Sequence, residues 1–295
     1  MIWMDRAELL TFEEIRRLVS VLARCGVHKI RLTGGEPLMR KDLPRLVRML
    51  VDVPGIDDCA ATTNGFFLPE QAAALKEAGL HRINISLDSL DPDTFAAMTR
   101  RSSYDKVWQG IEAADTAGIR PIKINAVLVR GMNEADIPRF AHLARERGFI
   151  PRFIEFMPIG QGDGWSRDQV VTGVEVIAAM ERATGVRLVP VERPGAQPAD
   201  RFQFEDGQGE IGFINSVSEP FCGSCNRVRI TSDGKLRTCL FSLVETDLRT
   251  LVRGGASDDD IEAAVRKAVD RKEAGHLIND PGFVRPQRTM SQIGG

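Results

Sequence analysis

The feature that most constrains the fold is a regular alternation of strand-like and helix-like segments in the first half of the chain. Strand patterns are predicted at 29–33, 59–63, 82–87, 122–128 and 152–157. Amphipathic helix patterns fill the intervals, with short loops on either side. Because each helix returns the chain to the same end of the sheet, repeated strand–helix units build a parallel sheet or barrel. The sequence therefore predicts an α/β fold.

Local signals mark where several helices begin. The segment 11–14 has the spacing of a capping box and is expected to open a helix that ends at Gly26. Asp42 and Asp91 are expected to cap two more helices, and Ser257 is expected to cap one near the C-terminus.

The alternation ends after Pro158. We expect a proline-bearing connection at 190–198, short β segments at 202–204 and 211–214, and a loose tail at the end of the chain. The change of pattern predicts two domains. Residues 1–158 would form a partial barrel, and residues 159–295 would form a C-terminal domain.

Three of the five cysteines, Cys222, Cys225 and Cys239, lie close together in the sequence. A strong turn signal at 232–235 predicts a hairpin that brings the third thiol back toward the first two. Soft thiolates select zinc or iron–sulfur clusters. A structural zinc site takes four ligands, and His276 is the only histidine downstream. The spacing favours a four-iron cluster with one open iron over zinc or three unrelated buried thiols.

Two arginines follow the first two of these cysteines. Arg227 and Arg229 are two residues apart in a strand-like run, so both are expected on one face. A guanidinium group matches the geometry of a phosphate group. We interpret the pair as a site for an anionic ligand, and a solvated basic edge strand is the alternative.

Residues that do not suit a core collect at the ends of the predicted strands. They are found at 33–36, 62–65, 86–89 and 157–158. In a parallel α/β barrel the chemistry is located at the carboxyl ends of the strands. Lys123 and Asn125 lie within an otherwise apolar strand, where a lysine needs a partner or a cavity. Each residue alone fits ordinary turn chemistry, but the clustering predicts a ligand site.

Composition excludes several classes of function. The net charge of −2 over 295 residues provides no basic field for nucleic acid, and the 6% aromatic content provides few surfaces on which bases could stack. No apolar run approaches the length of a membrane span. An odd number of cysteines, three of them clustered, indicates a reducing compartment, so we expect a cytoplasmic protein.

On these residues the sequence closely resembles the MoaA family of GTP 3′,8-cyclases, which are radical S-adenosylmethionine enzymes of molybdenum-cofactor biosynthesis. The resemblance covers nearly the whole chain. Its motifs are IRLTGGEPL at 30–38, ISLDSL at 85–90, FIEFMP at 153–158 and the cysteine hairpin at 222–240. It implies an incomplete, six-stranded barrel of the TIM type whose open side is covered by a C-terminal α+β iron–sulfur domain. It also implies that the enzyme converts GTP to (8S)-3′,8-cyclo-7,8-dihydroguanosine 5′-triphosphate.

The resemblance assigns roles to residues at matching positions. S-adenosylmethionine would be held by Gly34, Gly35, Glu36, Ser86 and Met157. GTP would be contacted by Arg31, Thr62, Lys123, Arg227, Val228 and Arg229. The C-terminal [4Fe-4S] cluster, whose open iron takes the guanine, would be bound by Cys222, Cys225 and Cys239. Cys25 and Cys59 match no cluster position and are expected in the core.

The sequence departs from the family pattern in one respect. Family members begin with a strand and a Cys-x3-Cys-x2-Cys loop that binds a first [4Fe-4S] cluster, and this chain has neither. The chain as given is therefore expected to be inactive, either as a truncated or misassigned product or as a non-catalytic GTP-binding remnant. A radical enzyme acting on another substrate is the further alternative. The expected partners are GTP, S-adenosylmethionine and the next pterin-forming enzyme, and the sequence leaves a homodimer open.

Overall fold

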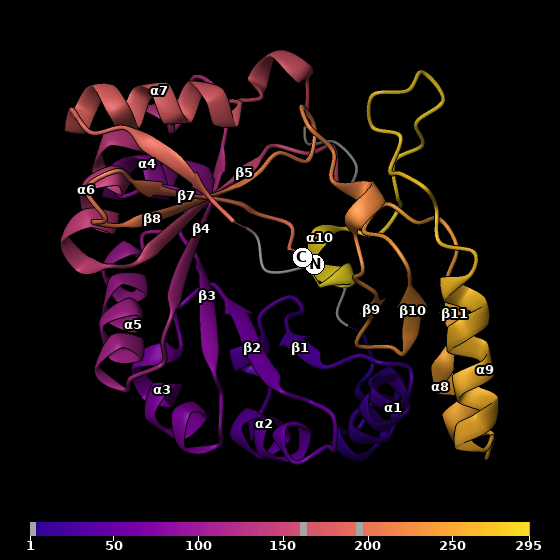
Figure 1. Ribbon diagram of the computed structural model, residues 1–295. Coiled ribbons are helices and arrows are strands. Elements are labelled where there is room, and N and C mark those ends of the chain that lie inside the picture. The colour runs from indigo at the N-terminus through magenta and orange to yellow at the C-terminus, as the bar shows by residue number, and fades with distance from the viewer. Residues whose placement is uncertain (1–3, 160–163, 193–196, 295) are drawn as a thin grey trace.

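The computed structural model describes residues 4–159, 164–192 and 197–294. Its centre is one curved sheet with the strand order β1-β2-β3-β4-β5-β8-β7-β6 (Figure 1). The strands are β1 (Lys29–Leu32), β2 (Asp58–Thr63), β3 (Arg82–Ser86), β4 (Ile122–Leu128), β5 (Ile150–Glu155), β6 (Leu188–Val191), β7 (Asp200–Phe204) and β8 (Glu210–Ile214). The predicted α/β fold is confirmed.

The first five strands are parallel neighbours in chain order, and β8 continues the parallel run beside β5. The last two strands, β7 and β6, are antiparallel. The expectation that residues 190–198 only connect is wrong at its beginning, because β6 includes Pro190. Proline is tolerated there because β6 is an edge strand, which needs ladder hydrogen bonds on one side only.

Helices cover the outer face of the sheet (Figure 1). They are α1 (Phe12–Arg24), α2 (Leu43–Val51), α3 (Leu68–Glu77), α4 (Pro92–Thr99), α5 (Tyr104–Thr116), α6 (Ile137–Arg147) and α7 (Gly173–Thr184). The main core lies between these helices and the sheet and includes buried residues such as Ile83, Ile124 and Phe140. None of the described helices is long and apolar enough to cross a bilayer.

The predicted helix caps are confirmed in three cases and wrong in one. Thr11 and Glu14 form the expected capping box, Asp91 accepts from the Thr94 N–H, and Ser257 caps its helix. Asp42 precedes α2 but makes no capping hydrogen bond, because its backbone is left-handed with φ of 59°. That conformation differs from the extended one in which a cap side chain reaches the first turn.

A second, smaller unit lies against α1. It contains the sheet β11-β10-β9 and three helices. The elements are β9 (Arg229–Ile230), β10 (Lys235–Arg237), β11 (Thr246–Asp247), α8 (Leu248–Arg253), α9 (Asp258–Val269) and α10 (Met290–Ile293). The antiparallel pairing of β9 with β10 confirms the predicted hairpin, and Gly234 occupies its turn with φ of 80°.

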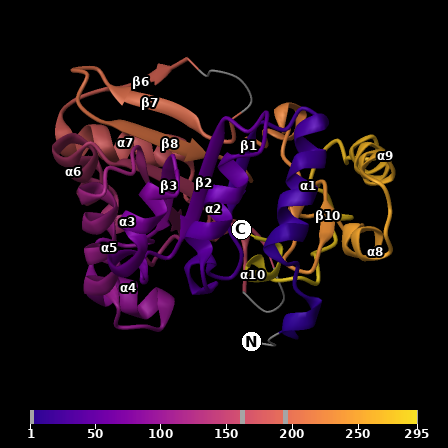
Figure 2. The same ribbon diagram turned by 90° about the horizontal axis from the view of Figure 1, so that it is seen from below.

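Helix α1 joins the two units because it has two apolar faces. Phe12 and Val19 belong to the core under the main sheet, whereas Leu18 and Leu22 pack with Leu236 of the hairpin in a separate cluster. Figure 2 shows α1 between α2 on one side and β10, α8 and α9 on the other. This packing places the cysteine hairpin beside β1, the edge strand of the main sheet.

Candidate functional site

The concave face of the main sheet is polar, whereas its helix-covered face is apolar. In β4, Ile122 and Ile124 are buried in the core, and Lys123 and Asn125 occupy the alternate positions of the opposite face. The register aligns further polar residues from neighbouring strands on that face. They are Arg31, Thr62, Arg82, Asn84 and Arg152. Three residues predicted to contact GTP therefore share one surface.

The cations on this surface repel one another. Burial lowers the pKa of Arg152 well below its ordinary value, and the charges of Arg31 and Arg82 lower it further. Burial also lowers the pKa of Lys123 to about 8, assisted by Arg152 and Arg82. Arg152 is only 5% exposed, and its Nε has no hydrogen-bond partner among the described residues. A buried cation without an acceptor is costly unless a ligand supplies one.

The carboxylates near this surface are already paired with other arginines. Both oxygens of Asp58 accept from Arg82 Nε at 2.9 Å. Glu210 forms a two-pronged pair with Arg201, at 2.8 and 2.7 Å. No described carboxylate hydrogen-bonds Arg31, Lys123 or Arg152. The surface therefore keeps an excess of positive charge, which suits a polyanionic ligand.

The three clustered cysteines lie in the loops around the β9–β10 hairpin. Cys222 begins a short 3-10 turn that Cys225 ends, and Cys239 follows β10. The Cys225 Sγ accepts from Arg227 Nε at 3.4 Å and from Lys272 Nζ at 3.7 Å. Burial opposes ionisation of Cys225, but the backbone N–H and guanidinium of Arg227 prevail and lower its pKa. Burial raises the pKa of the Cys239 thiol.

The three thiols are soft donors of the kind that hold iron–sulfur clusters. Within 4–159, 164–192 and 197–294, no three Cys, His, Asp or Glu side chains converge on one metal position. The nearby His276 uses Nδ1 to accept from the Ile278 N–H at 3.2 Å. Cationic donors at a ligand sulfur also suit the negative charge of a cluster.

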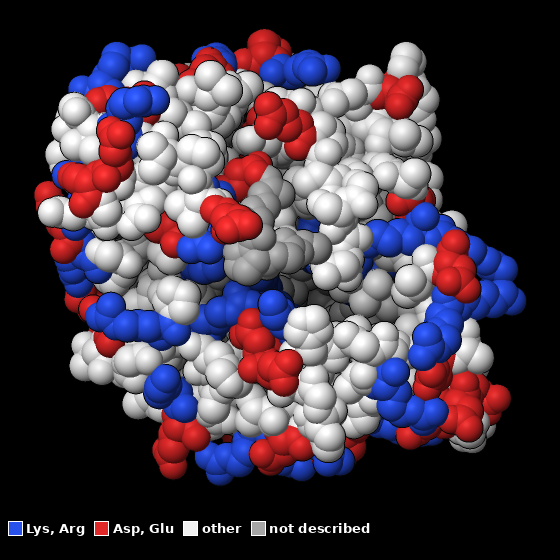
Figure 3. Space-filling view, in the orientation of Figure 1, with Lys and Arg blue, Asp and Glu red and all other residues white. Residues whose placement is uncertain are grey.

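Arg229 connects the cysteine hairpin to the concave face of the sheet. Burial lowers the pKa of Arg229, as do Arg227 and Arg31, whereas Cys239 and Cys225 act in the opposite direction. These effects indicate that Arg229 lies near both the thiols and the sheet arginine Arg31. On the side of the molecule seen in Figure 1, Figure 3 shows Lys and Arg side chains in a band that reaches a hollow near the middle. Val228, in contrast, packs against the cluster of apolar residues under α1.

The residues predicted to hold S-adenosylmethionine lie at the carboxyl ends of three strands. Gly34 follows β1 with φ of 138°, Ser86 ends β3 and is exposed, and Met157 follows β5. The Glu36 carboxylate accepts from the Thr63 hydroxyl and the Asn64 N–H, both at 2.7 Å. Glu36 thereby fixes the loop after β1 to the end of β2.

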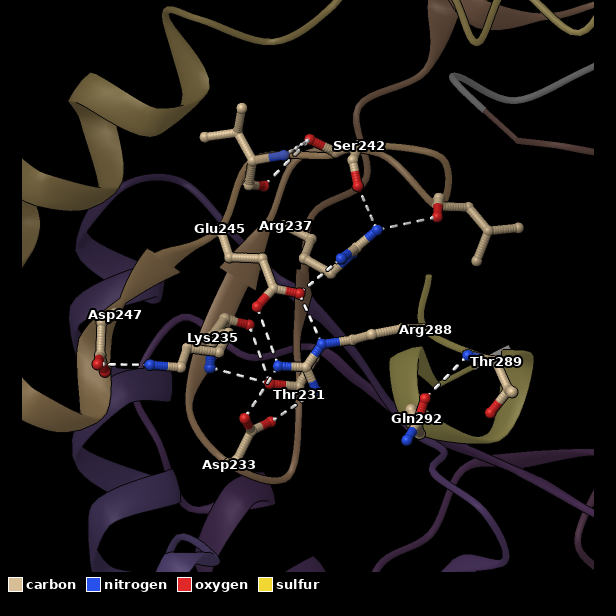
Figure 4. Close-up of polar contacts among 12 residues, drawn as sticks. Thr231, Asp233, Lys235, Arg237, Ser242, Glu245, Asp247, Arg288, Thr289 and Gln292 are labelled. Atoms are coloured by element: carbon tan, nitrogen blue, oxygen red, sulfur yellow. Dashed lines mark hydrogen bonds and ion pairs between the residues drawn. The ribbon is translucent and has the colours of Figure 1, made fainter. Parts of the chain in front are cut away.

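The C-terminal tail reaches the same space and is not the loose segment that the sequence predicted. Arg229 donates to the Gly294 carbonyl at 2.5 Å, and a Cβ on Gly294 would collide with the Thr33 hydroxyl. Upstream, Arg288 donates to Asp233 and Glu245 of the hairpin unit (Figure 4). These contacts hold the tail between Arg229 and the loop after β1.

Sequence reasoning missed two residues of the site. Arg152 is a charged residue inside a buried strand, which is the signal that identified Lys123 on the neighbouring strand. Lys272 lies beyond the end of α9 in a polar segment, where one more lysine carries no signal. Only the fold brings it to Cys225.

The remaining two cysteines do not form a second cluster site. Cys59 in β2 is fully buried, and burial raises its pKa to about 12. Cys25 ends α1 and packs with the apolar cluster there, where burial raises its pKa. Cys59 is a core residue, as predicted, whereas Cys25 is only partly buried and lies at the edge of a core cluster. The cysteines of this sequence therefore do not fit the first cluster of the family.

Comparisons with known proteins agree with this arrangement. The family model for the Radical SAM superfamily matches residues 2–144, and the model for Molybdenum Cofactor Synthesis C matches residues 150–278. The chain is 46% identical to the GTP 3′,8-cyclase of Acidothermus cellulolyticus, over 91% of this chain and 74% of the relative. It is 44% identical to that of Rhodopirellula baltica, over 99% and 82% of the two chains. For the enzyme of Pelotomaculum thermopropionicum the identity is 45%, over 99% and 89%. The chain therefore belongs to the radical SAM family of GTP 3′,8-cyclases, the enzymes that act in molybdenum-cofactor biosynthesis.

Proposed function

We propose that this chain binds GTP in the space between the concave face of the sheet and the cysteine hairpin. The observation that carries the proposal is a group of cations that have no carboxylate partner among the described residues, led by the buried Arg152 and the half-buried Lys123. A triphosphate supplies the acceptors that they lack. Arg31, Thr62 and Arg229 would border the same space, so the protein would contact the nucleotide along its length.

Cys222, Cys225 and Cys239 would bind a [4Fe-4S] cluster at the other side of this space. When bound, such a cluster offers an open iron to a nucleobase nitrogen or oxygen, and so would orient the guanine. The protein residues would hold the triphosphate, fix the ribose and base relative to one another, and exclude water. This positioning is what joining the 3′ carbon of the ribose to C8 of the guanine requires.

The S-adenosylmethionine site would be formed by Gly34, Gly35, Glu36, Ser86 and Met157, at the rim of a partial barrel. The cysteines present do not fit the first cluster. We therefore propose that residues 1–295 alone form no 5′-deoxyadenosine from S-adenosylmethionine and dithionite. Formation of 5′-deoxyadenosine at rates typical of radical SAM enzymes would contradict this.

The experiment that tests the GTP site is calorimetric titration of the anaerobically reconstituted chain. Removing a desolvated arginine from a phosphate partner typically costs about 2–5 kcal/mol, so Arg229→Met should weaken GTP binding at least tenfold, or about 1.4 kcal/mol. Arg227→Ala should weaken it similarly. The control is Arg45→Met, because Arg45 is exposed and pairs with Glu13 at the surface. Equal affinities in all variants would show that the arginines bind no nucleotide.

A second titration separates the alternative functions. Iron analysis should show one cluster, which Cys225→Ser abolishes. ATP and CTP should compete poorly with GTP if the guanine meets the cluster. Equal competition would favour a radical enzyme with another substrate, and GTP binding without a cluster would favour a non-catalytic remnant.

A further inference from the structure

The segment that follows α9, residues 272–276, lies against the loops of all three clustered cysteines. Lys272 Nζ donates to the Cys225 sulfur at 3.7 Å and to the Thr238 carbonyl, next to Cys239, at 2.9 Å. A Cβ on Gly275 would lie 3.9 Å from the Cys222 Cβ. One short segment therefore contacts the loops of all three cysteines that would bind the proposed cluster.

Lys272 makes a third bond that completes this arrangement. Its ammonium donates to the Arg227 carbonyl at 2.6 Å. The three acceptors use all three donors of an ammonium group and come from two separate loops. Lys272 thus ties the loop of Cys225 to the loop of Cys239, and it places a positive charge at a ligand sulfur.

The next residue, Glu273, holds the loop of Cys239 with a negatively charged carboxylate. The Glu273 carboxylate accepts from the Thr238 hydroxyl at 2.9 Å and from the Ser242 hydroxyl at 2.5 Å, on either side of Cys239. Lys272 and Glu273 therefore both hold the cysteine loops in place, but their side chains carry opposite charges. Only Lys272 reaches a sulfur.

We propose that Lys272 is a positioning residue for the C-terminal cluster, which holds the cysteine loops at the cluster's spacing and raises its reduction potential. The inference rests on the proposed cluster site. Hydrogen bonds to the sulfurs and net charge set the potential of such clusters. A cation bonded to Cys225 Sγ stabilises the reduced, more negative form. Outer residues of this kind typically change metal affinity about 10- to 100-fold when they are removed.

The test compares Lys272→Met with the unaltered chain after anaerobic reconstitution. Iron release to a chelator should become about 10- to 100-fold faster, and the midpoint potential should become more negative. The matched control is Lys267→Met, because Lys267 is an exposed residue of α9. Unchanged iron release together with an unchanged potential in Lys272→Met would overturn the proposal.

Two further variants separate the charge from the geometry. Lys272→Arg keeps the charge but cannot reproduce the three bonds of an ammonium, so iron release should be faster while the potential stays near that of the unaltered chain. Glu273→Gln removes a negative charge and should raise the potential. If Lys272→Met does not fold, Lys272→Arg keeps the proposal testable, since iron release no faster than in the unaltered chain contradicts it. If the unaltered chain itself takes up no cluster, the proposed function fails instead.

Discussion

Two groups of arginines in this molecule, each with one buried member, have opposite surroundings. In the hairpin unit, Arg237 donates to Glu245 at 2.5 Å, and Arg288 pairs with Asp233 at 3.0 Å (Figure 4). On the concave face of the sheet, Arg152 is as deeply buried as Arg237 but has no hydrogen-bonded carboxylate in the part of the chain that the structure describes. Arg237 and Arg152 each leave Nε without an acceptor among the described residues, so the two groups differ in charge: carboxylates neutralise the first, whereas no described carboxylate pairs with the second.

The pKa shifts separate the two groups in the same way. Burial opposes the charge of Arg288, but its bonds to Asp233 and Glu245 prevail and raise its pKa. Burial and neighbouring cations lower the pKa of Arg152. An arginine that a carboxylate neutralises connects parts of the fold, and an arginine without a carboxylate partner is available to a ligand. The two groups should therefore respond differently to the same substitution.

The largest effect is expected on stability in the hairpin unit. Arg237→Met removes donors to Glu245 and to the carbonyls of Leu240 and Ser242, in a side chain only 3% exposed. Breaking a buried ion pair at one partner typically costs about 3–5 kcal/mol, and we expect that loss in the free energy of unfolding. Urea denaturation measures it. A midpoint as high as that of the exposed control Arg45→Met would mean that the network contributes no stability.

The same substitution on the concave face should affect binding instead. Arg152→Met should weaken GTP binding at least tenfold, or about 1.4 kcal/mol, because a phosphate contact is lost. Stability should stay the same or increase, because an uncompensated buried charge is removed. Calorimetry and urea denaturation together test this. A large loss of stability without a change in affinity would place Arg152 with the structural arginines.

Lys123 should make both properties depend on pH. Its pKa of about 8 in the fold lies below the ordinary value of 10.5, mainly because of burial. At a pH between these two pKa values, Lys123 is more protonated in the unfolded chain than in the folded protein. The stability of the ligand-free protein should therefore increase as pH rises from about 8 to 10.5. GTP affinity should decrease over the same range as the ammonium loses its charge. Lys123→Met should flatten both profiles, and unaltered profiles would show that another group titrates.

The sequence predicted the sheet well because its signals are local. The alternation of apolar and polar residues in β4 and the capping box at Thr11 each depend on a few neighbouring residues, and both are confirmed. Asp42 was mistaken for a cap because its residue type suits the role, whereas its backbone conformation depends on the preceding loop. Strand β6 was not predicted because it includes Pro190, and proline is rare in strands that pair on both sides.

The site was predicted in part, because motifs identify residues but not their neighbours. Arg31, Thr62 and Lys123 were located from the family resemblance, and the register places them on one face. The tail was expected to be loose because Arg288 finds Asp233 only after the chain folds. Lys272 was missed because its partners are distant in sequence, and Arg152 was missed although a charged residue within a strand is a local signal.

The smallest effect should come from the carboxylate nearest to the unsatisfied cations. Glu210 favours the charged forms of Lys123 and Arg152, but its oxygens are bound by Arg201. Glu210→Gln removes this negative charge and should strengthen GTP binding by up to about fivefold, close to 1 kcal/mol. Arg201→Met should have the opposite effect, because the released carboxylate can turn toward Arg152 and compete with the phosphates. Calorimetry on both variants measures the two shifts. Two shifts of the same sign would mean that the pair acts through the fold of β7 and β8, and the excess of positive charge would then not depend on how Glu210 is held.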